Sequence, residues 1–223
     1  LSPAPILRFI MKKLLFLIFA FPLSVFASPC DNLFPNGKEI VVKDTVPLCN
    51  SFYVVLYDKT HNAAVISAEV TQPKDQHADR TNDFHADSRL KDAPTPADYN
   101  NTGYDRGHLT PAADSDDAKE MSETFLMSNM TPQAPKLNRG AWRLMEIKVR
   151  GLDTKYIVTG AVYKYPAKTI GKHQIPVPDS YFKVVYLKNG KTSVFTAVNN
   201  DSAQIVETTL DDLEKKLDYK FPR

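Results

Sequence analysis

The residues with the clearest chemical potential lie near the middle of the chain, where Asp105, Arg106 and His108 fall within four positions. Histidine is the side chain best suited to act as a general base near neutral pH. A neighbouring arginine suits a phosphate group, because its guanidinium stays charged and can donate to two oxygens at once. The tetrapeptide therefore indicates proton transfer beside an anion. The alternative is a loop histidine next to a local Asp105–Arg106 ion pair.

A second set of residues recurs at intervals of four, from Asn138 through Trp142 and Glu146 to Arg150. On a helix this spacing places all four on one face. Amide and carboxylate oxygens suit Mg²⁺, which keeps much of its hydration shell and needs few protein ligands. The alternatives are structural: a buried Trp142, which we favour because large aromatics are usually buried, and a surface Glu146–Arg150 pair. Asn138 could instead cap the helix, with the same oxygen that a metal would need.

The elements that must position these residues are predicted from hydrophobic patterns. Runs of β-branched and aromatic residues predict strands on both sides of a helical middle. We expect Ser115 to cap the first helix, with Asp116 and Asp117 in its first turn. This order favours an α+β fold, a mixed α/β domain with a central antiparallel sheet. The predicted strands cover residues 52–57, 64–70, 156–159, 181–187 and 193–198, and the predicted helices cover residues 115–127, 138–150 and 207–217.

Residues 71–104 form a long polar segment that contains proline and has little periodicity. A loop of this length is uncommon inside a compact domain and is often functional. It leads directly into the tetrapeptide that ends at His108, and it contains the two arginines Arg80 and Arg89. We therefore expect this segment to contribute to the site.

The first 27 residues have the pattern of a secretory signal peptide. Lys12 and Lys13 precede an apolar run, and Val25-Phe26-Ala27 supplies a small-residue end, so we expect cleavage before Ser28 and one domain over residues 28–223. The run is shorter than the roughly 20 apolar residues that span a bilayer, so no membrane anchor is expected after cleavage. The alternative is an uncleaved anchor. Met11 is the expected start, with residues 1–10 due to a misplaced start site.

Export would also decide the state of the two cysteines, Cys30 and Cys49. In an oxidising compartment we expect them to pair, and closing this loop is worth about 3 kcal/mol in the chain-entropy model. Two free thiols are the alternative.

The charge balance gives no reason to expect nucleic acid as a partner. The whole chain carries a formal charge of +2, and loss of residues 1–27 removes three basic residues and leaves 25 basic against 26 acidic. Any attraction to a polyanion must therefore be local. Lys136, Arg139 and Arg143 could provide it, although such a group is often only a solvated helix face.

Taken together, these motifs resemble the DNA/RNA non-specific endonuclease family. The resemblance rests on Asp105-Arg106-Gly107-His108, on Asn129-x-x-Pro132-Gln133 and on Asn138-x-x-x-Trp142-x-x-x-Glu146, and it covers residues 52–198. It implies a ββα-metal active-site motif on the antiparallel sheet. It also implies an enzyme that hydrolyses phosphodiester bonds of DNA and RNA with little sequence preference. Together with the signal pattern of residues 1–27, we expect this enzyme to be exported, periplasmic or extracellular.

The resemblance assigns roles to individual residues. It implies that His108 is the general base, and that Asn138 is the protein ligand of a single Mg²⁺, for which Mn²⁺ could substitute. Arg80 would stabilise the charged transition state, with Arg89 as its competitor. Supporting or substrate-contacting roles fall to Asp105, Arg106, Glu146, Asn129, Arg139 and Arg150.

Two further functions remain open at this point. One is a metal-dependent phosphodiesterase restricted to DNA or to RNA, and the other is an inactive nucleic-acid-binding module of the same fold. The inactive module is disfavoured because both His108 and Asn138 are present. The sequence indicates neither an oligomeric state nor an inhibitor protein.

Overall fold

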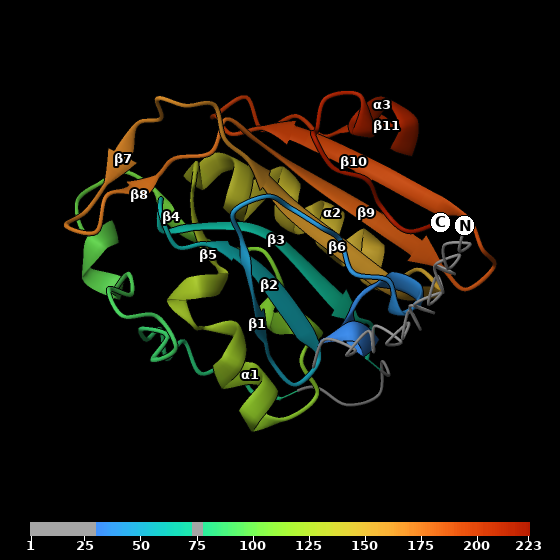
Figure 1. Cartoon of the computed structure of the whole chain (residues 1–223), viewed down its shortest axis with the longest axis horizontal. Helices are drawn as coiled ribbons and strands as arrows, with labels where there is room; N and C mark the ends of the chain where they lie inside the picture. The colour runs from blue at the N-terminus through green and yellow to red at the C-terminus, as the bar shows by residue number, and fades with distance from the viewer. Residues whose placement is uncertain (1–29, 73–77) are drawn as a thin grey trace, which may run out of the picture.

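The computed structural model describes residues 30–72 and 78–223, and the expected signal peptide lies outside the described residues. A seven-stranded sheet forms the centre, with the strand order β1-β2-β3-β6-β9-β10-β11 and every neighbouring pair antiparallel. The predicted central antiparallel sheet is thus confirmed (Figure 1). The strands are β1 (Val46–Cys49), β2 (Tyr53–Asp58), β3 (Ala63–Val70), β6 (Thr154–Val162), β9 (Ser180–Leu187), β10 (Thr192–Val198) and β11 (Val206–Thr208).

The central strands are buried on both faces, and alternate residues enter two separate cores. Val55 and Val185 pack with Trp142 and the helix that follows it, which lies behind the sheet in Figure 1. Val54 and Val184 pack on the opposite face, beneath segments from the two ends of the chain. Burial on both faces explains why these strands appear in the sequence as continuous apolar runs.

Two strands outside the large sheet carry the central tetrapeptide. β4 (Asp105–His108) pairs antiparallel with β5 (Met130–Gln133), so the tetrapeptide is a strand and not a loop. A second small sheet joins β7 (Thr169–Ile170) to β8 (Ile175–Pro176). β4, β5 and the helix after them follow one another in the order expected for a ββα motif.

The predicted helix 138–150 is not regular from end to end. It begins as a π-helical segment, η6 (Leu137–Trp142), and continues as α2 (Arg143–Arg150). Gly140 inside η6 has φ −106° and ψ −108°, which lies outside the helical region. The break interrupts the four-residue spacing between Asn138 and Trp142, so the predicted single stripe is wrong at its first position. Trp142 itself is 1% exposed, which confirms the expected core position.

The first predicted helix is shorter than expected. α1 (Ala118–Thr124) is capped by Asp117, whose carboxylate accepts a hydrogen bond from the Glu120 N–H at 2.8 Å. The predicted cap Ser115 is wrong, because its hydroxyl donates to the carbonyl of Ala112 in the preceding turn, η4 (Ala112–Asp114).

The predicted C-terminal helix 207–217 is wrong at both ends. Its first residues pair with β10 as β11, and α3 (Leu210–Glu214) begins only after Thr209. The Thr209 hydroxyl accepts a hydrogen bond from the Asp212 N–H at 3.1 Å and so caps α3. A capping threonine therefore separates strand from helix inside a segment that reads as one amphipathic run.

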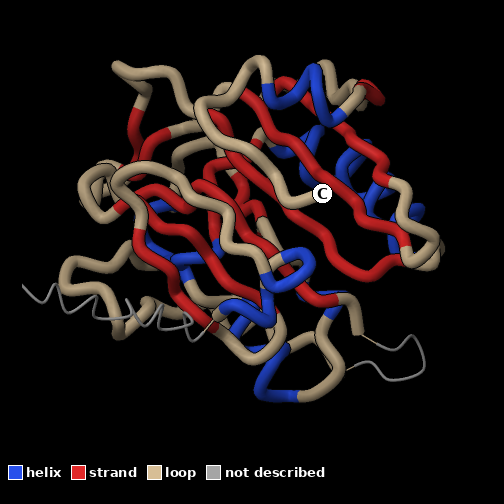
Figure 2. Tube along the Cα trace, turned by 45° about the vertical axis from the view of Figure 1, so that its right-hand side comes forward, coloured by secondary structure: helices blue, strands red, loops and turns tan. Residues whose placement is uncertain are grey.

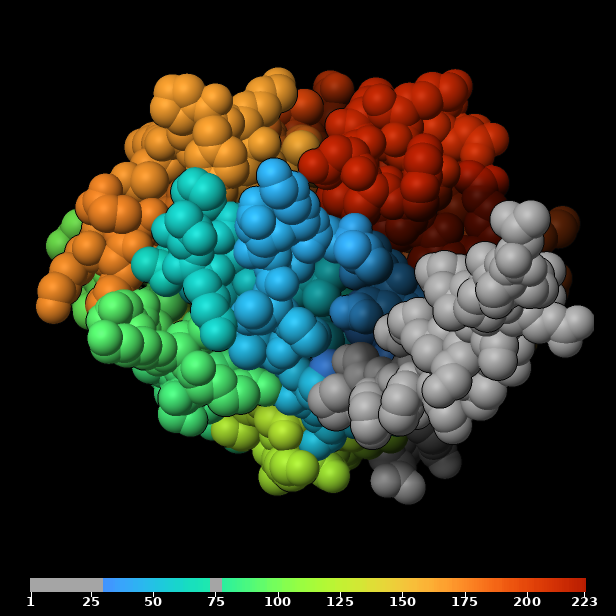
Figure 3. Space-filling view, in the orientation of Figure 1, coloured from blue at the N-terminus to red at the C-terminus, as the bar shows by residue number. Residues whose placement is uncertain are grey.

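Cys30 and Cys49 form a disulfide, with their Cα atoms 5.6 Å apart, as expected. The bond ties the N-terminal segment to the end of β1. In Figure 3 the blue segment that follows residue 30 and the red C-terminal segment lie next to each other. Among residues 30–72 and 78–223, no helix is both long and apolar enough to cross a membrane.

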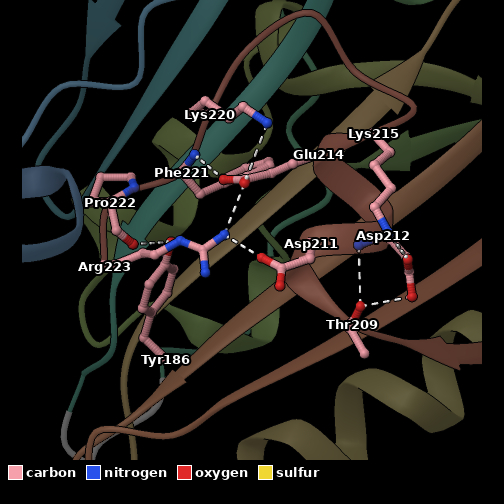
Figure 4. A network of polar contacts seen from close by, with 10 residues as sticks. All are labelled: Tyr186, Thr209, Asp211, Asp212, Glu214, Lys215, Lys220, Phe221, Pro222 and Arg223. Carbon is pink, nitrogen blue, oxygen red and sulfur yellow. Dashed lines mark hydrogen bonds and ion pairs between the residues drawn. The ribbon is translucent and has the colours of Figure 1, made fainter.

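The face of the sheet opposite α2 is called the outer face here. The C-terminal segment crosses this outer face and is held by buried polar contacts (Figures 2 and 4). Glu214 is 6% exposed and accepts hydrogen bonds from the Phe221 N–H and from Arg223, both at 2.9 Å. The Tyr186 hydroxyl donates to the carbonyl of Pro222 at 3.0 Å. Glu214 is therefore the centre of this attachment.

We predict that Glu214→Ala lowers the free energy of unfolding by about 1–3 kcal/mol, because it leaves the buried Phe221 N–H without an acceptor. The matched control is Asp211→Ala, which removes only an exposed ion pair with Arg223 and should change stability little. Urea denaturation followed by circular dichroism measures both. Equal effects of the two substitutions would show that Glu214 does not anchor the C-terminal segment.

Candidate active site

His108 is the last residue of β4, and its imidazole packs against two aromatic rings that also contact each other. The ring centroids of Phe84 and Phe125 are 5.8 and 5.1 Å from that of His108. Burial, together with the positive charge of Arg80, lowers the pKa of His108 to about 3. Its Nε2 is buried and has no hydrogen-bond partner among residues 30–72 and 78–223. His108 is therefore a neutral imidazole at neutral pH, the form that can accept a proton.

The backbone after His108 is fixed by Asn129. The Asn129 Oδ1 accepts from the Thr110 N–H at 3.0 Å, and its Nδ2 donates to the carbonyls of Thr110 and Thr124, each at 2.9 Å. Asn129 is 0% exposed. A buried amide with both ends bonded favours a supporting role over the direct substrate contact that was also expected of it.

Gly107 is required by the close packing of the two short strands. A Cβ at this position would lie 2.6 Å from the Cβ of Gln133, closer than real Cβ atoms approach one another. Any larger residue would separate β4 from β5 and displace the adjacent His108.

Asp105, at the other end of β4, connects the hairpin to the helical segment. Its carboxylate accepts hydrogen bonds from Asn138 Nδ2 at 2.9 Å and from Arg139 Nε at 2.7 Å. The local Asp105–Arg106 ion pair considered from the sequence is therefore wrong, because Asp105 pairs with Arg139 instead. Asp105 fixes the Asn138 amide relative to the strand that carries His108.

Asn138 does not cap the helix. Its backbone N–H already donates to the Ala134 carbonyl at 2.9 Å, and η6 begins one residue earlier with no side-chain cap. The Asn138 Nδ2 is taken by Asp105, whereas its Oδ1 accepts no hydrogen bond from the part of the chain that the structure describes. The capping alternative is wrong, and the amide oxygen is available to a ligand.

Arg80 and Arg89, the competing arginines, occupy different environments. The Arg80 guanidinium lies 5.0 Å from the centre of the Phe125 ring, and its charge acts on both His108 and Glu146. Arg89 donates to the buried Asp87 at 2.6 Å and to the carbonyl of Cys49. This geometry brings Arg80, and not Arg89, to the site of His108.

Arg106 and Arg150 have structural partners. Arg106 donates to the carbonyl of Pro96 at 2.9 Å and lies 5.0 Å from the centre of the Phe84 ring. Arg150 forms an ion pair with Asp114 at 3.0 Å, and it also lines a cavity of about 250 Å³ together with Arg80. Two arginines that line one cavity suit a phosphate.

Glu146 on α2 is an ionisable group of this site with a raised pKa. Burial and the negative charge of Asp114 raise its pKa, Lys183 and Arg150 oppose the increase, and the resulting value is about 7. Its charge in turn acts on Arg80. Glu146 is therefore sensitive to the charges around it near physiological pH.

Sequence reasoning missed Phe125 at this site. Phe125 contacts both His108 and Arg80, yet in the sequence it is only an apolar residue near the end of a helix. Lys183 is 1% exposed and is the single charge inside the apolar strand β9. No three His, Cys, Asp or Glu side chains among residues 30–72 and 78–223 gather as a metal site, which leaves the Asn138 amide as the candidate.

We predict that the His108 imidazole stays neutral from about pH 8 down to about pH 5, because burial and Arg80 both disfavour the imidazolium. Arg80→Ala should raise the pKa of His108, since it removes a nearby cation. The control Arg143→Ala removes an exposed arginine of α2 and should leave this pKa unchanged. Histidine NMR titration measures all three proteins. A wild-type His108 that titrates near pH 6.5 contradicts this description.

The chain is similar in sequence to known nucleases. The sequence profile of the family described as DNA/RNA non-specific endonuclease matches residues 31–223. Mitochondrial endonuclease G of Bos taurus is 34% identical over 158 residues, which cover 61% of this chain and 52% of that protein. Nuclease C1 of Cunninghamella echinulata var. echinulata is 30% identical over 185 residues, covering 70% of this chain and 73% of that one.

The fold is shared with a solved structure. A chain from the crystal structure of an EndoG/EndoGI complex superposes with a TM-score of 0.68 at 26% identity, covering 76% of this chain and 82% of that chain. This chain spans about half the length of the mitochondrial endonuclease G proteins it matches.

Proposed function

Because this chain belongs to the DNA/RNA non-specific endonuclease family, we propose that it is an exported, Mg²⁺-dependent endonuclease that hydrolyses phosphodiester bonds of DNA and RNA. The observation that carries this proposal is that one site contains both a neutral His108 and an Asn138 whose amide oxygen is available to a ligand. Both are fixed by β4, through its own backbone and through Asp105.

His108 is proposed as the general base that takes a proton from the attacking water. Its lowered pKa keeps it neutral, and the Phe84 and Phe125 rings restrict its orientation. Arg80 would donate to the non-bridging phosphate oxygens, where charge develops in the transition state. Because these groups act on the phosphate and not on the base, cleavage should depend little on nucleotide sequence.

The residues present fit a single hydrated Mg²⁺. Asn138 would hold it through Oδ1, since Asp105 holds the amide nitrogen and so turns the oxygen outward from that contact. One neutral oxygen ligand suits Mg²⁺, which binds proteins through few ligands and keeps several waters. When bound, the ion would supply charge neutralisation at the phosphate. Mn²⁺ has the same preference for oxygen ligands and could replace it.

Two groups are proposed to contact the substrate backbone. Arg150 faces the cavity that Arg80 also lines. Lys136, Arg139 and Arg143 are exposed around η6 and the start of α2, and Arg139 also pairs with Asp105. A local group of this kind would attract a polyanion although the chain without residues 1–27 has nearly balanced charge.

Export is proposed from the N-terminal pattern of residues 1–27 and is supported by the Cys30–Cys49 disulfide. Disulfides persist in oxidising compartments and are rare in the cytoplasm. A periplasmic or extracellular location would also separate a nuclease of low specificity from the nucleic acid of its own cell.

We predict that His108→Ala reduces cleavage of plasmid DNA and of RNA by about 10²–10⁴-fold, the usual contribution of a general base. Its fold should persist, because the imidazole Nε2 makes no hydrogen bond with the described part of the chain. The control His85→Ala removes an exposed histidine outside the site. Near-normal turnover by folded His108→Ala enzyme rules out this role for His108.

We predict that Asn138→Ala loses most activity at low Mg²⁺ and regains part of it at high Mg²⁺, because an affinity loss can be offset by concentration. Cleavage measured over a range of Mg²⁺ concentrations tests this, with EDTA-treated wild type as the zero point. Leu144→Ala, at an exposed position of α2 with no proposed role, serves as the control in the same helical region. A fall in thermal stability with unchanged Mg²⁺ dependence would make Asn138 structural only.

A further inference from the structure

A second cavity with basic side chains lies at the beginning of β4, beyond the Asp105 end of the proposed active site. It has a volume of about 540 Å³ and is lined by the segments that precede β4 and η6 and by the loops that follow β6 and β10. Its lining includes Tyr104, Lys136 and Lys168. Tyr104 directly precedes Asp105, and Lys136 stands two residues before Asn138. The cavity therefore adjoins the contact that fixes the proposed metal ligand.

The Lys168 ammonium is held at this cavity by an aromatic ring. Its Nζ lies 4.9 Å from the centre of the Tyr104 ring and donates to the Tyr104 hydroxyl oxygen at 3.4 Å. An ammonium over the face of an aromatic ring is attracted by the negative potential of that face. The ring in turn packs against the apolar cluster that contains Ile170 and Ile175 of the β7–β8 hairpin. A long, exposed side chain is thus restrained beside β4.

The positive charges at the cavity are not fully balanced by the protein. Among residues 30–72 and 78–223, no carboxylate forms an ion pair with Lys168. Lys136 pairs with Asp201 across 3.7 Å, but the two side chains are 72% and 60% exposed. An ion pair this exposed contributes little and is easily exchanged for another partner. Two ammonium groups and one exposed carboxylate favour an anionic ligand.

The walls of the cavity are fixed by the Asn199 side chain. Its Oδ1 accepts a hydrogen bond from the Ala134 N–H at 2.8 Å, and its Nδ2 donates to the carbonyls of Pro132 and Pro178, each at 2.9 Å. These bonds tie the loop after β10 to the end of β5 and to the segment that leads into η6. A cavity whose walls are already ordered binds a ligand at a lower entropic cost.

The two basic cavities lie at opposite ends of β4. The cavity of Arg80 and Arg150 is lined by residues that follow His108, among them Ala112. β4 has four residues and rises about 3.3 Å per residue, so its ends are about 10 Å apart. Phosphates of one strand of a duplex follow one another at about 3.4 Å along the axis, so the cavities are a few nucleotides apart. A strand that occupies both must cross the proposed active site.

We infer that the cavity of Tyr104, Lys136 and Lys168 is a subsite for the nucleic-acid strand beside the scissile phosphate, where the two lysines bind backbone phosphate and Tyr104 holds Lys168 in place. The inference rests on the proposed function and adds the path of the substrate, from the Arg150 cavity across His108 to Lys168. Because the contacts are to phosphate, the subsite takes DNA and RNA of any sequence.

Lys168→Met tests the inference, because it removes the charge and keeps the length of an exposed side chain. Binding to a labelled single strand of about 20 nucleotides, as DNA and as RNA, is measured by fluorescence anisotropy in EDTA at several salt concentrations. Loss of one phosphate contact should weaken binding about fivefold at 0.1 M salt and reduce the slope of log K against log [salt] by about 0.7.

The matched control is Lys155→Met. The Lys155 ammonium lies 5.2 Å from the centre of the Tyr156 ring, so the control removes the same charge from the same kind of contact. Lys155 stands at the start of β6, whereas Lys168 follows its end, and a nine-residue strand is about 26 Å long. We expect Lys155→Met to leave the salt slope unchanged.

The role of Tyr104 is tested by a double-mutant cycle. Tyr104→Leu should weaken binding when Lys168 is present and have little further effect in Lys168→Met, because the ring acts through the ammonium. Equal losses in the two backgrounds would contradict this part of the inference.

The subsite is overturned if Lys168→Met and Lys155→Met bind the single strand with the same affinity and the same salt slope. If the wild-type protein still cleaves DNA and RNA in that case, the proposed function stands without the subsite. A wild-type protein that binds the strand through Lys168 but cleaves neither nucleic acid refutes the proposed function and supports the subsite. A wild-type protein that neither binds nor cleaves refutes both.

Discussion

The carboxylate of Asp105 is the contact on which the arrangement of the site depends. It begins the strand that ends at His108, and it accepts hydrogen bonds from Asn138 and Arg139, more than thirty residues later in the chain. The segment it holds is interrupted at Gly140, so helical geometry alone does not fix where Asn138 lies. One carboxylate thus sets the proposed general base and the proposed metal ligand in a fixed relation.

The local parts of this site could be read from the sequence, whereas its long-range pairings could not. Apolar runs located the strands, and the spacing around His108 located the site. Asp105 has an arginine as its direct neighbour, and only the fold shows that it pairs with Arg139 instead. Likewise, the capping role considered for Asn138 depended on whether the chain was already helical before it. Asp117 and Thr209 were missed as caps because several residues near each helix start could have served.

The two faces of the sheet serve different purposes. The outer face, under the chain ends and the disulfide, is almost entirely apolar and stabilises the fold. The face below α2 buries an ammonium and a carboxylate that an ordinary core would exclude. Departures of this kind from a consistent apolar core are expected at functional sites, where stability is given up for electrostatic control. Lys183 stands out for the same reason, because a lysine is rarely buried inside an apolar strand.

The central claim is that Asn138, held by Asp105, forms the metal site beside His108. Anomalous diffraction from a crystal soaked in Mn²⁺ tests it most directly, because the ion is located independently of any activity. The account predicts one strong peak at about 2.1 Å from Asn138 Oδ1, an oxygen-ligand distance, with His108 outside the coordination shell. A peak coordinated by His108, or binding only at sites remote from Asn138, would contradict it.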